Sequence, residues 1–395
     1  MMEIPYGKHE IDIDDINAVV KVLQSSTLTQ GPYVHEFEEN FAKYVGSNYA
    51  VAVSNGTAAL HLSMLALNLN EDDSVITTPI TFAASANCVK YAGANVVFSD
   101  IDRESFLLDL EKVEELLSKK PIGTYKGIIP VQFSGRMVNL EKLRELADKY
   151  KLWIVEDACH SPGAYFIDSS GKEQKSGNSK FTDLSVFSFH PVKHIASGEG
   201  GMITTNSKIL YDRLLSLRTH GITKNLSEFK NSIIEAGGID LYPNWYMEMQ
   251  ELGYNYRITD IQASLGNSQL KKANSGVLKR REIAYKYNEA FSKMTSILNH
   301  SGYVEGHAYH LYIIEVENRL ELYNYLRTFN IFTQIHYFPC HLMPYYKQFG
   351  YKNGDYLNAE SYYQNCLSIP IFPSLTDEEQ LFVIEKINTF LNESC

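Results

Sequence analysis

The sequence predicts an α/β protein whose main body is a doubly wound, mostly parallel seven-stranded sheet with helices on both faces. Short apolar segments alternate with segments of helical periodicity through the first half of the chain, which is typical of such sheets. Some of these apolar segments run directly into a small polar turn and a helical pattern, as happens at the carboxyl edge of a parallel sheet. The motifs become sparse after Asp260, where a smaller α+β domain is expected.

The chain is expected to begin with two amphipathic helices, over residues 11–25 and 34–44. The apolar face of the first helix carries Ile13, Ile16, Val19, Val20 and Leu23.

Seven segments have the length and apolar content of buried strands: residues 49–53, 74–78, 95–99, 126–132, 152–156, 183–188 and 201–205. Helical patterns separate most of them, for example at residues 111–117 and 140–150. The last two strands are too close in sequence for a helical crossover, so residues 201–205 are expected to run antiparallel to their neighbour.

Two domains are expected, a large one over residues 1–255 and a small one over residues 256–395. In the second, residues 261–270 and 278–293 have helical patterns, while residues 310–316 and 332–336 with two further helices suggest an α+β unit. Residues 224–250 fit neither regular pattern. We interpret them as a loop over a site or an interface, with a loose surface excursion as the alternative.

Composition excludes several classes of protein. At 395 residues and 44% hydrophobic content, the chain can bury a large core and is not disordered. A net charge of −11 disfavours nucleic acid and anionic membrane surfaces as partners. No apolar run approaches the roughly 20 residues of a membrane span, and the N-terminus does not resemble a signal peptide. We therefore expect a cytoplasmic protein with no membrane contact. The five cysteines show no metal-binding spacing, so no metal site is expected.

The most informative residue is Lys193, which lies between an aromatic, hydroxyl-containing strand end and the glycine-rich segment 198–201. A desolvated lysine loses its proton more readily and can form a Schiff base. The glycines permit a close approach of the backbone to a ligand. Taken alone, the segment favours a solvated lysine before an ordinary turn.

Asp157 stands at the end of the apolar segment 152–156, where ligands of open α/β sheets bind. A carboxylate in this place can hold a pyridine nitrogen protonated, as the electron sink of pyridoxal phosphate (PLP) requires. The alternatives for Asp157 are a helix cap and a surface acid. Nearby Cys159 is interpreted as a small buried residue rather than a nucleophile.

Two further strand ends have the composition of a ligand site. Ser54-Asn55-Gly56-Thr57 follows strand 49–53 and opens a helix, whose first N–H groups and dipole favour a bound phosphate. An ordinary helix cap by Ser54 or Asn55 is the alternative. Strand 74–78 is followed by Thr81 and Phe82, and the Phe82 ring can either stack on a flat cofactor or belong to the core.

Together these segments resemble the PLP-dependent nucleotide-sugar aminotransferases of the DegT/StrS group, which have the fold-type I aspartate aminotransferase scaffold. The resemblance covers nearly the whole chain, and its pseudaminic acid branch is the most similar in the His190–Lys193 segment. Further segments that carry it are Ile4-Pro5-Tyr6-Gly7, Leu28-Thr29-Gln30-Gly31-Pro32, Arg218-Thr219-His220-Gly221, the run from Gly253 to Ala263, and the run from His336 to His341.

The resemblance implies a role for each matching residue. Lys193 would hold PLP as a Schiff base and then move a proton, Asp157 would pair with the ring nitrogen, and Phe82 would cover the ring. His160 would lie against the ring or its phenolic oxygen, unless it is a hydrogen-bonded core histidine. The phosphate would be bound by Gly56, Thr57 and Ser188, and by Asn255 of a second subunit in a homodimer with shared sites. The sugar nucleotide would contact Tyr6, Leu28, Thr29, Arg218, His336, Tyr337 and His341.

The implied reaction is transfer of an amino group from L-glutamate to C4 of a UDP-linked 4-keto-6-deoxy-N-acetylhexosamine, as in pseudaminic acid biosynthesis. The alternatives are transfer at C3, transfer to another keto sugar such as a dTDP-linked one, and a PLP-binding regulator. Related 3-dehydratases carry histidine in place of the lysine, so Lys193 disfavours dehydration. The sequence shows no arginine pair for the carboxylates of the amino donor.

Overall fold

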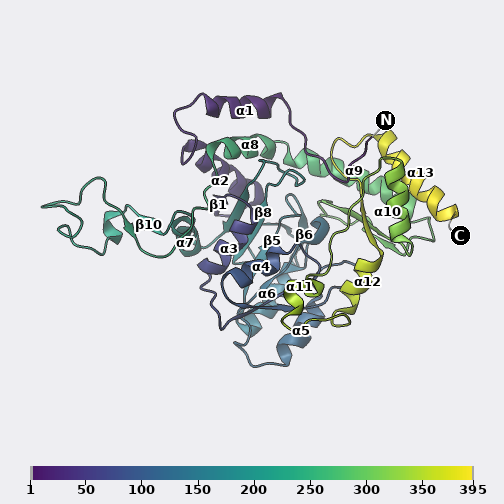
Figure 1. The fold of residues 1–395 in the computed structure, drawn as a ribbon, viewed down its shortest axis with the longest axis horizontal. Coiled ribbons are helices and arrows are strands. Elements are labelled where there is room, and N and C mark those ends of the chain that lie inside the picture. Colours follow the sequence, from purple (N-terminus) through teal and green to yellow (C-terminus); the bar gives the residue numbers. More distant parts are fainter. Residues whose placement is uncertain (1–2, 394–395) are drawn as a thin grey trace.

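The computed structural model describes residues 3–393 and confirms the seven-stranded sheet (Figure 1). Its strand order is β1-β9-β8-β5-β4-β2-β3. Neighbouring strands are parallel from β8 across to β3, whereas β9 is antiparallel to both β8 and β1, as its short connection predicts. The strands are β1 (Tyr49–Val53), β2 (Ser74–Thr77), β3 (Asn95–Phe98), β4 (Gly127–Ile129), β5 (Trp153–Asp157), β8 (Leu184–Ser188) and β9 (Gly201–Thr205).

Helices cover both faces of this sheet because consecutive strand residues point to opposite sides. Val75 and Val155 belong to a buried cluster with α3, α4 and α7, whereas the adjacent Ile76 and Ile154 belong to a second cluster with α5 and α6. The helices of this part are α1 (Ile13–Leu23), α2 (Pro32–Val45), α3 (Gly56–Ala66), α4 (Ala84–Tyr91), α5 (Leu110–Ser118), α6 (Leu140–Tyr150) and α7 (Lys208–Arg218).

The C-terminal part contains a three-stranded antiparallel sheet of order β12-β13-β14 with helices packed against it. Residues 332–336, expected as a strand, instead run as extended chain with an isolated bridge from Gln334 to Ser368. The elements are α8 (Asp260–Leu270), α9 (Ala273–Phe291), β12 (Asn299–His300), β13 (Tyr312–Glu315), α10 (Arg319–Thr328), α11 (Pro344–Lys347), α12 (Leu357–Asn365), β14 (Cys366–Ile369) and α13 (Asp377–Glu393).

Two details of packing cross the predicted domain boundary at residue 255. Ile4 is fully buried in the C-terminal hydrophobic cluster and bridges Ile331, so the beginning of the chain packs with its end. Helix α8 packs on α1 and α2, and its Ala263 is buried beside Phe37 and Phe41. The division into domains 1–255 and 256–395 stays a prediction.

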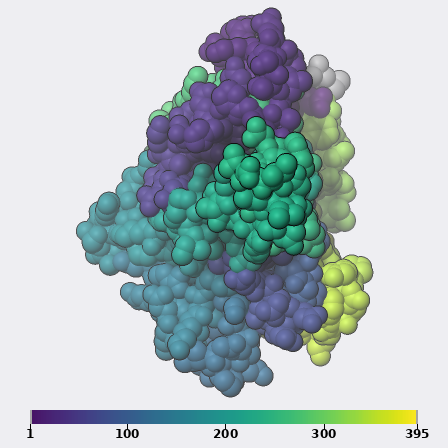
Figure 2. All heavy atoms as spheres, turned by 90° about the vertical axis from the view of Figure 1, so that its left-hand side faces the viewer, coloured from purple at the N-terminus to yellow at the C-terminus, as the bar shows by residue number. Residues whose placement is uncertain are grey.

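Residues 224–250 form an excursion that projects from the rest of the chain (Figure 1). Strand β10 (Ile222–Thr223), just before it, pairs with β11 (Glu248–Met249) near its end, and the excursion contains a 3-10 turn, Leu226–Glu228. Figure 2 views the molecule from this side, with the excursion in front (green) and the N-terminal helices above it (purple). Ile239 and Trp245 are 89% and 71% exposed, so the excursion carries large apolar side chains into solvent.

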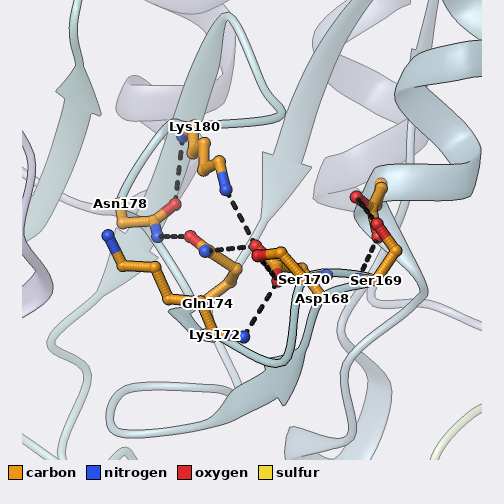
Figure 3. A network of polar contacts seen from close by, with 8 residues as sticks. Asp168, Ser169, Ser170, Lys172, Gln174, Asn178 and Lys180 are labelled. Atoms are coloured by element: carbon orange, nitrogen blue, oxygen red, sulfur yellow. Dashed lines mark hydrogen bonds and ion pairs between the residues drawn. The ribbon is translucent and has the colours of Figure 1, made fainter.

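A polar network supports the small β6 (Tyr165–Ile167) and β7 (Glu173–Lys175) hairpin (Figure 3). The buried Asp168 carboxylate accepts hydrogen bonds from Lys180 Nζ at 2.8 Å, Ser170 Oγ at 2.6 Å and Gln174 Nε2 at 2.7 Å. These donors, of which Lys180 has the largest effect, hold the pKa of Asp168 well below its usual range.

Two more 3-10 turns, Phe133–Gly135 and Cys340–Leu342, complete the secondary structure. None of the helices within residues 3–393 is long and apolar enough to cross a lipid bilayer.

Asp168→Asn should lower the melting temperature at neutral pH, because the charge that Lys180 and Ser170 recognise is removed. The folded-state pKa is depressed, so this stabilisation is complete above the unfolded aspartate pKa of about 3.9 and is lost as the pH falls toward the folded value. The difference in melting temperature from wild type should therefore shrink below about pH 4. The exposed Asp212, paired with Lys208 on one helix, is the control, and Asp212→Asn should change little. A pH-independent difference would contradict this assignment.

Candidate active site

A cavity of about 710 Å³ opens at the carboxyl edge of the main sheet. The loops that follow β1, β2, β5 and β8 all reach it, and the loop from β8 to β9 brings Lys193 into its wall. Most of the residues predicted from the sequence meet here: Tyr6, Gly56, Thr57, Phe82, Asp157, His160, Ser188, Lys193, His336 and Tyr337.

The Lys193 amine lies in a desolvated setting. Burial lowers the pKa of Lys193, and the nearby Cys159 and Asp157 oppose this shift without cancelling it. Its Nζ is 3.4 Å from Nε2 of His310, and its backbone N–H donates to the carbonyl of His190 at 2.8 Å, which fixes the turn. A lowered pKa favours the neutral amine that can attack a carbonyl group.

Asp157 is the last residue of β5, and its carboxylate is buried in the wall of the cavity. Oδ2 accepts a hydrogen bond from Ser85 Oγ at 2.5 Å, and Oδ1 accepts one from the Cys159 N–H at 3.2 Å. The backbone of Asp157 is fixed as well, because its N–H donates to Pro130 at 2.9 Å and its carbonyl accepts from Gln132 at 3.0 Å. The carboxylate is therefore held in one place relative to Lys193.

The start of helix α3 forms a concave surface at the same edge. Asn55 caps the helix by accepting a hydrogen bond from the Ala58 N–H at 2.8 Å. The helix cap predicted for Ser54 or Asn55 is therefore present, and it is formed by Asn55. The N–H groups of Gly56 and Thr57, at the first two helical positions, have no intrahelical acceptor and line the cavity. A Cβ on Gly56 would come within 2.9 Å of the Ser188 Cβ, so only glycine allows β8 to approach α3 this closely.

Aromatic and imidazole rings form the opposite wall. Phe82 is 62% exposed at the cavity and therefore is not a core residue. Tyr337 lies 6.1 Å from Phe82 between ring centroids, and its hydroxyl is 3.2 Å from Nε2 of His160. Tyr6 and His336 lie 5.4 Å apart, and burial lowers the pKa of His336 to about 3.

Buried histidines surround Lys193 and are neutral. Burial holds the pKa values of His160, His194 and His310 well below the usual histidine range, and the Lys193 charge adds to each shift. His160 Nδ1 accepts from the Ser134 N–H at 3.3 Å, so the neutral ring carries its proton on Nε2 and donates to Tyr337. His160 is thus both hydrogen-bonded and exposed to the cavity.

Five predicted residues do not line this cavity: Leu28, Thr29, Arg218, Asn255 and His341. Arg218 forms an ion pair with Glu38 and donates to the Ala52 carbonyl at 2.7 Å. With Gln30, Thr219 and Arg257 it lines a second cavity of about 230 Å³. Isolated bridges bring three more of these residues near the second cavity. Asn255 pairs with Thr219, and Thr29, which follows Leu28, pairs with Thr259.

The structure does not place His341 at the Lys193 cavity. Its side chain is fully buried, and Nε2 lies 3.0 Å from the Glu360 carboxylate. His341 therefore has a structural partner in place of a substrate contact. Other polar residues outside the predicted set also line the cavity, among them Thr81, Ser85, Tyr91, Glu199, Tyr256 and His310. For Thr81 and Ser85 the available signal was their place between the end of a strand and the start of a helix.

Comparison with known proteins shows the family of the chain. Residues 9–388 match the model of the DegT/DnrJ/EryC1/StrS aminotransferase family. The chain is 35% identical over 399 residues to the UDP-4-amino-4,6-dideoxy-N-acetyl-beta-L-altrosamine transaminase of Campylobacter jejuni, covering 99% of this chain and 98% of that protein.

Two solved structures are similar over almost their whole length. PseC of Helicobacter pylori, an aminotransferase involved in the biosynthesis of pseudoaminic acid, superimposes with a TM-score of 0.86 at 28% identity, over 99% of this chain and all of that one. The PLP form of the putative sugar aminotransferase Spr1654 of Streptococcus pneumoniae gives a TM-score of 0.88 at 26% identity, over the full length of both chains.

Proposed function

Since this chain belongs to the DegT/DnrJ/EryC1/StrS aminotransferase family, and is thus a PLP-dependent sugar aminotransferase, we propose that it transfers an amino group from L-glutamate to C4 of a UDP-linked 4-keto-6-deoxy-N-acetylhexosamine. The observation that carries the proposal is the desolvated Lys193 amine in one cavity with the fixed Asp157 carboxylate and the open N–H groups of α3.

The residues of the cavity fit PLP part by part. A carboxylate suits a pyridinium nitrogen, a desolvated amine suits an aldehyde, and unpaired N–H groups with the Ser188 hydroxyl suit a phosphate. When bound, PLP supplies the electron sink that allows an amino group to leave one molecule and join another.

Each side chain then has a defined task in our proposal. Lys193 would hold the cofactor through its amine, and the same amine would serve as the base that moves a proton. Asp157 keeps the ring nitrogen protonated, and Gly56, Thr57 and Ser188 bind the phosphate. Phe82 covers one ring face and excludes water from it. His160, which donates to Tyr337, lies against the ring or its phenolic oxygen.

The choice of sugar rests on the relatives and on the cavity wall. The transaminase of C. jejuni and PseC of H. pylori both carry names from altrosamine and pseudoaminic acid chemistry. Tyr6, His336 and Tyr337 offer rings and hydrogen-bonding groups for a sugar nucleotide. We therefore propose a role in making a bacterial surface sugar such as pseudaminic acid.

The test is an amino-transfer assay with purified protein, PLP, L-glutamate and the UDP-linked 4-keto sugar. We expect 2-oxoglutarate beyond one equivalent per active site to form only when the keto sugar is present, because glutamate alone supports a single half-reaction. Formation with a dTDP-linked keto sugar alone would favour the alternative substrate. Absence of turnover with every keto sugar, in protein that binds PLP, would favour a regulatory relative and contradict the proposal.

We also propose a homodimer with shared sites. Its support is that Arg218 lines a second cavity and that Asn255, which bridges Thr219 of that cavity, does not line the Lys193 cavity of its own chain. Exposed apolar side chains lie at the N-terminal helices and the excursion: Ile13 is 65% exposed although it belongs to the apolar face of α1, and Trp245 is 71% exposed. A second copy would cover these surfaces and bring Asn255 to the phosphate of its partner.

Asn255→Ala should fold normally and bind PLP more weakly, because the phosphate loses a donor from the other subunit. Mixing Lys193→Ala chains with Asn255→Ala chains should create heterodimers with one intact site, since both changes fall in the other site. Subunit exchange followed by the amino-transfer assay checks this. The shared site is wrong if exchange is verified and activity does not return, or if active protein sediments as a monomer.

A further inference from the structure

Behind the Asp157 carboxylate lies a pair of buried hydroxyl groups, Thr81 and Ser85. Ser85 Oγ is 2.5 Å from Asp157 Oδ2, and Thr81 Oγ1 is 2.7 Å from Ser85 Oγ. Ser85 is fully buried and Thr81 is 1% exposed, yet both line the wall of the Lys193 cavity. Ser85 is the second residue of α4, and Thr81 lies in the bend that precedes the helix.

The direction of these hydrogen bonds follows from the groups involved. An ionised carboxylate only accepts, so Ser85 donates its single hydrogen to Asp157. The Phe82 carbonyl, at 3.4 Å from Ser85 Oγ, is a much poorer acceptor for the same hydrogen. The Ser85 oxygen must then accept from Thr81, which gives a one-way relay from Thr81 through Ser85 to Asp157.

This relay is the main hydrogen-bond support of the carboxylate. Among residues 3–393, no Lys, Arg or His nitrogen lies within ion-pair distance of Asp157. The Ser85 hydroxyl on Oδ2 and the Cys159 N–H on Oδ1 therefore fix the plane of the carboxylate. A hydrogen bond to a charged acceptor is shorter and stronger than one between neutral groups, which fits the 2.5 Å separation.

We propose that Ser85, supported by Thr81, is a positioning residue that orients Asp157 and stabilises its charge, so that the carboxylate keeps the PLP ring nitrogen protonated. This inference rests on the role that the proposed function gives to Asp157. A hydroxyl needed only for the helix would instead bond to a carbonyl of the preceding turn, as Ser63 does with Ala59 in α3 at 2.8 Å.

The test compares variants by ¹⁵N NMR of the bound cofactor, prepared with ¹⁵N at the pyridine position, because the chemical shift reports protonation of that nitrogen directly. Ser85→Ala should move the signal toward that of neutral pyridine, in the direction set by Asp157→Asn, and should lower kcat about tenfold, equivalent to 1.4 kcal/mol of barrier. Thr81→Val, which leaves Ser85 in place, should give a smaller shift in the same direction. Thr81→Ser should restore the wild-type signal.

Ser63→Ala is the matched control, since it removes a buried helical hydroxyl remote from Asp157. It should leave the ring-nitrogen signal unchanged. The inference is overturned, with the role of Asp157 intact, if Asp157→Asn shifts the signal and Ser85→Ala does not. If Asp157→Asn itself causes no shift, the proposed role of Asp157 fails and this inference fails with it. If Ser85→Ala does not fold, the comparison of Thr81→Val with Thr81→Ser tests the relay instead. Equal ring-nitrogen signals in these two variants would refute it.

Discussion

Lys193→Ala should abolish amino transfer, because no other amine in the cavity can hold the cofactor covalently and then move the proton. The wall of the cavity contains Lys193 as its only lysine within residues 3–393. Borohydride reduction of the wild-type protein should trap a cofactor adduct, and mass spectrometry should place it on the peptide that contains residue 193. The variant should yield no adduct and no turnover above background.

Lys208→Ala is a suitable control, because Lys208 is exposed on α7 and pairs with Asp212 away from the cavity. This control should retain full activity and the adduct. A trapped adduct on another lysine in the wild-type protein, or turnover by Lys193→Ala at the wild-type rate, would show that the site has been assigned to the wrong residue.

Asp157→Asn should lower kcat by about 100-fold or more, equivalent to nearly 3 kcal/mol of barrier at 1.4 kcal/mol for each factor of ten. The substitution preserves the shape of the side chain but removes the charge that holds the ring nitrogen protonated. Cofactor binding should weaken less, since the phosphate contacts of Gly56, Thr57 and Ser188 are unchanged.

Steady-state kinetics and a PLP titration on the same preparation separate these two effects. The melting temperature of Asp157→Asn should be measured beside them, because Ser85 and Cys159 donate to the native carboxylate. A kcat close to that of wild type in a folded, PLP-loaded variant would mean that another acid serves the ring nitrogen.

The sequence allowed the main sheet and the centre of the site to be predicted because local patterns determine both. Apolar runs define the strands, and residues at their carboxyl ends, such as Asp157 and Ser188, must meet at one edge of a parallel sheet. Lys193 could be placed with them because its loop directly follows β8.

The remaining residues depended on contacts that no local pattern contains. His310 approaches Lys193 across 117 positions in sequence, and Ser85 reaches Asp157 across 72. His341 follows His336 closely, but it lies within the 3-10 turn Cys340–Leu342, where its side chain contacts Glu360 and not the cavity. Arg218 ends α7 beside Glu38, which neutralises it.

Interaction surfaces were also difficult to infer. An apolar helical face predicts burial, but the sequence does not show whether the same chain or a second chain covers it. Ile16 and Leu23 lie on the apolar face of α1, yet in the single chain they are 50% and 56% exposed. The periodicity correctly predicted the helix, and the exposed face is one of the observations behind the homodimer proposal.

The central claim is amino transfer to C4 of a UDP-linked keto sugar, and NMR of the product tests it most directly. The protein would be incubated with PLP, ¹⁵N-labelled L-glutamate and the UDP-linked 4-keto-6-deoxy-N-acetylhexosamine, and the product examined for the carbon that bears the label. We predict ¹⁵N on C4 and one 2-oxoglutarate for each sugar converted. Label on C3, or an unlabelled sugar after incubation with a PLP-loaded protein, would contradict the account.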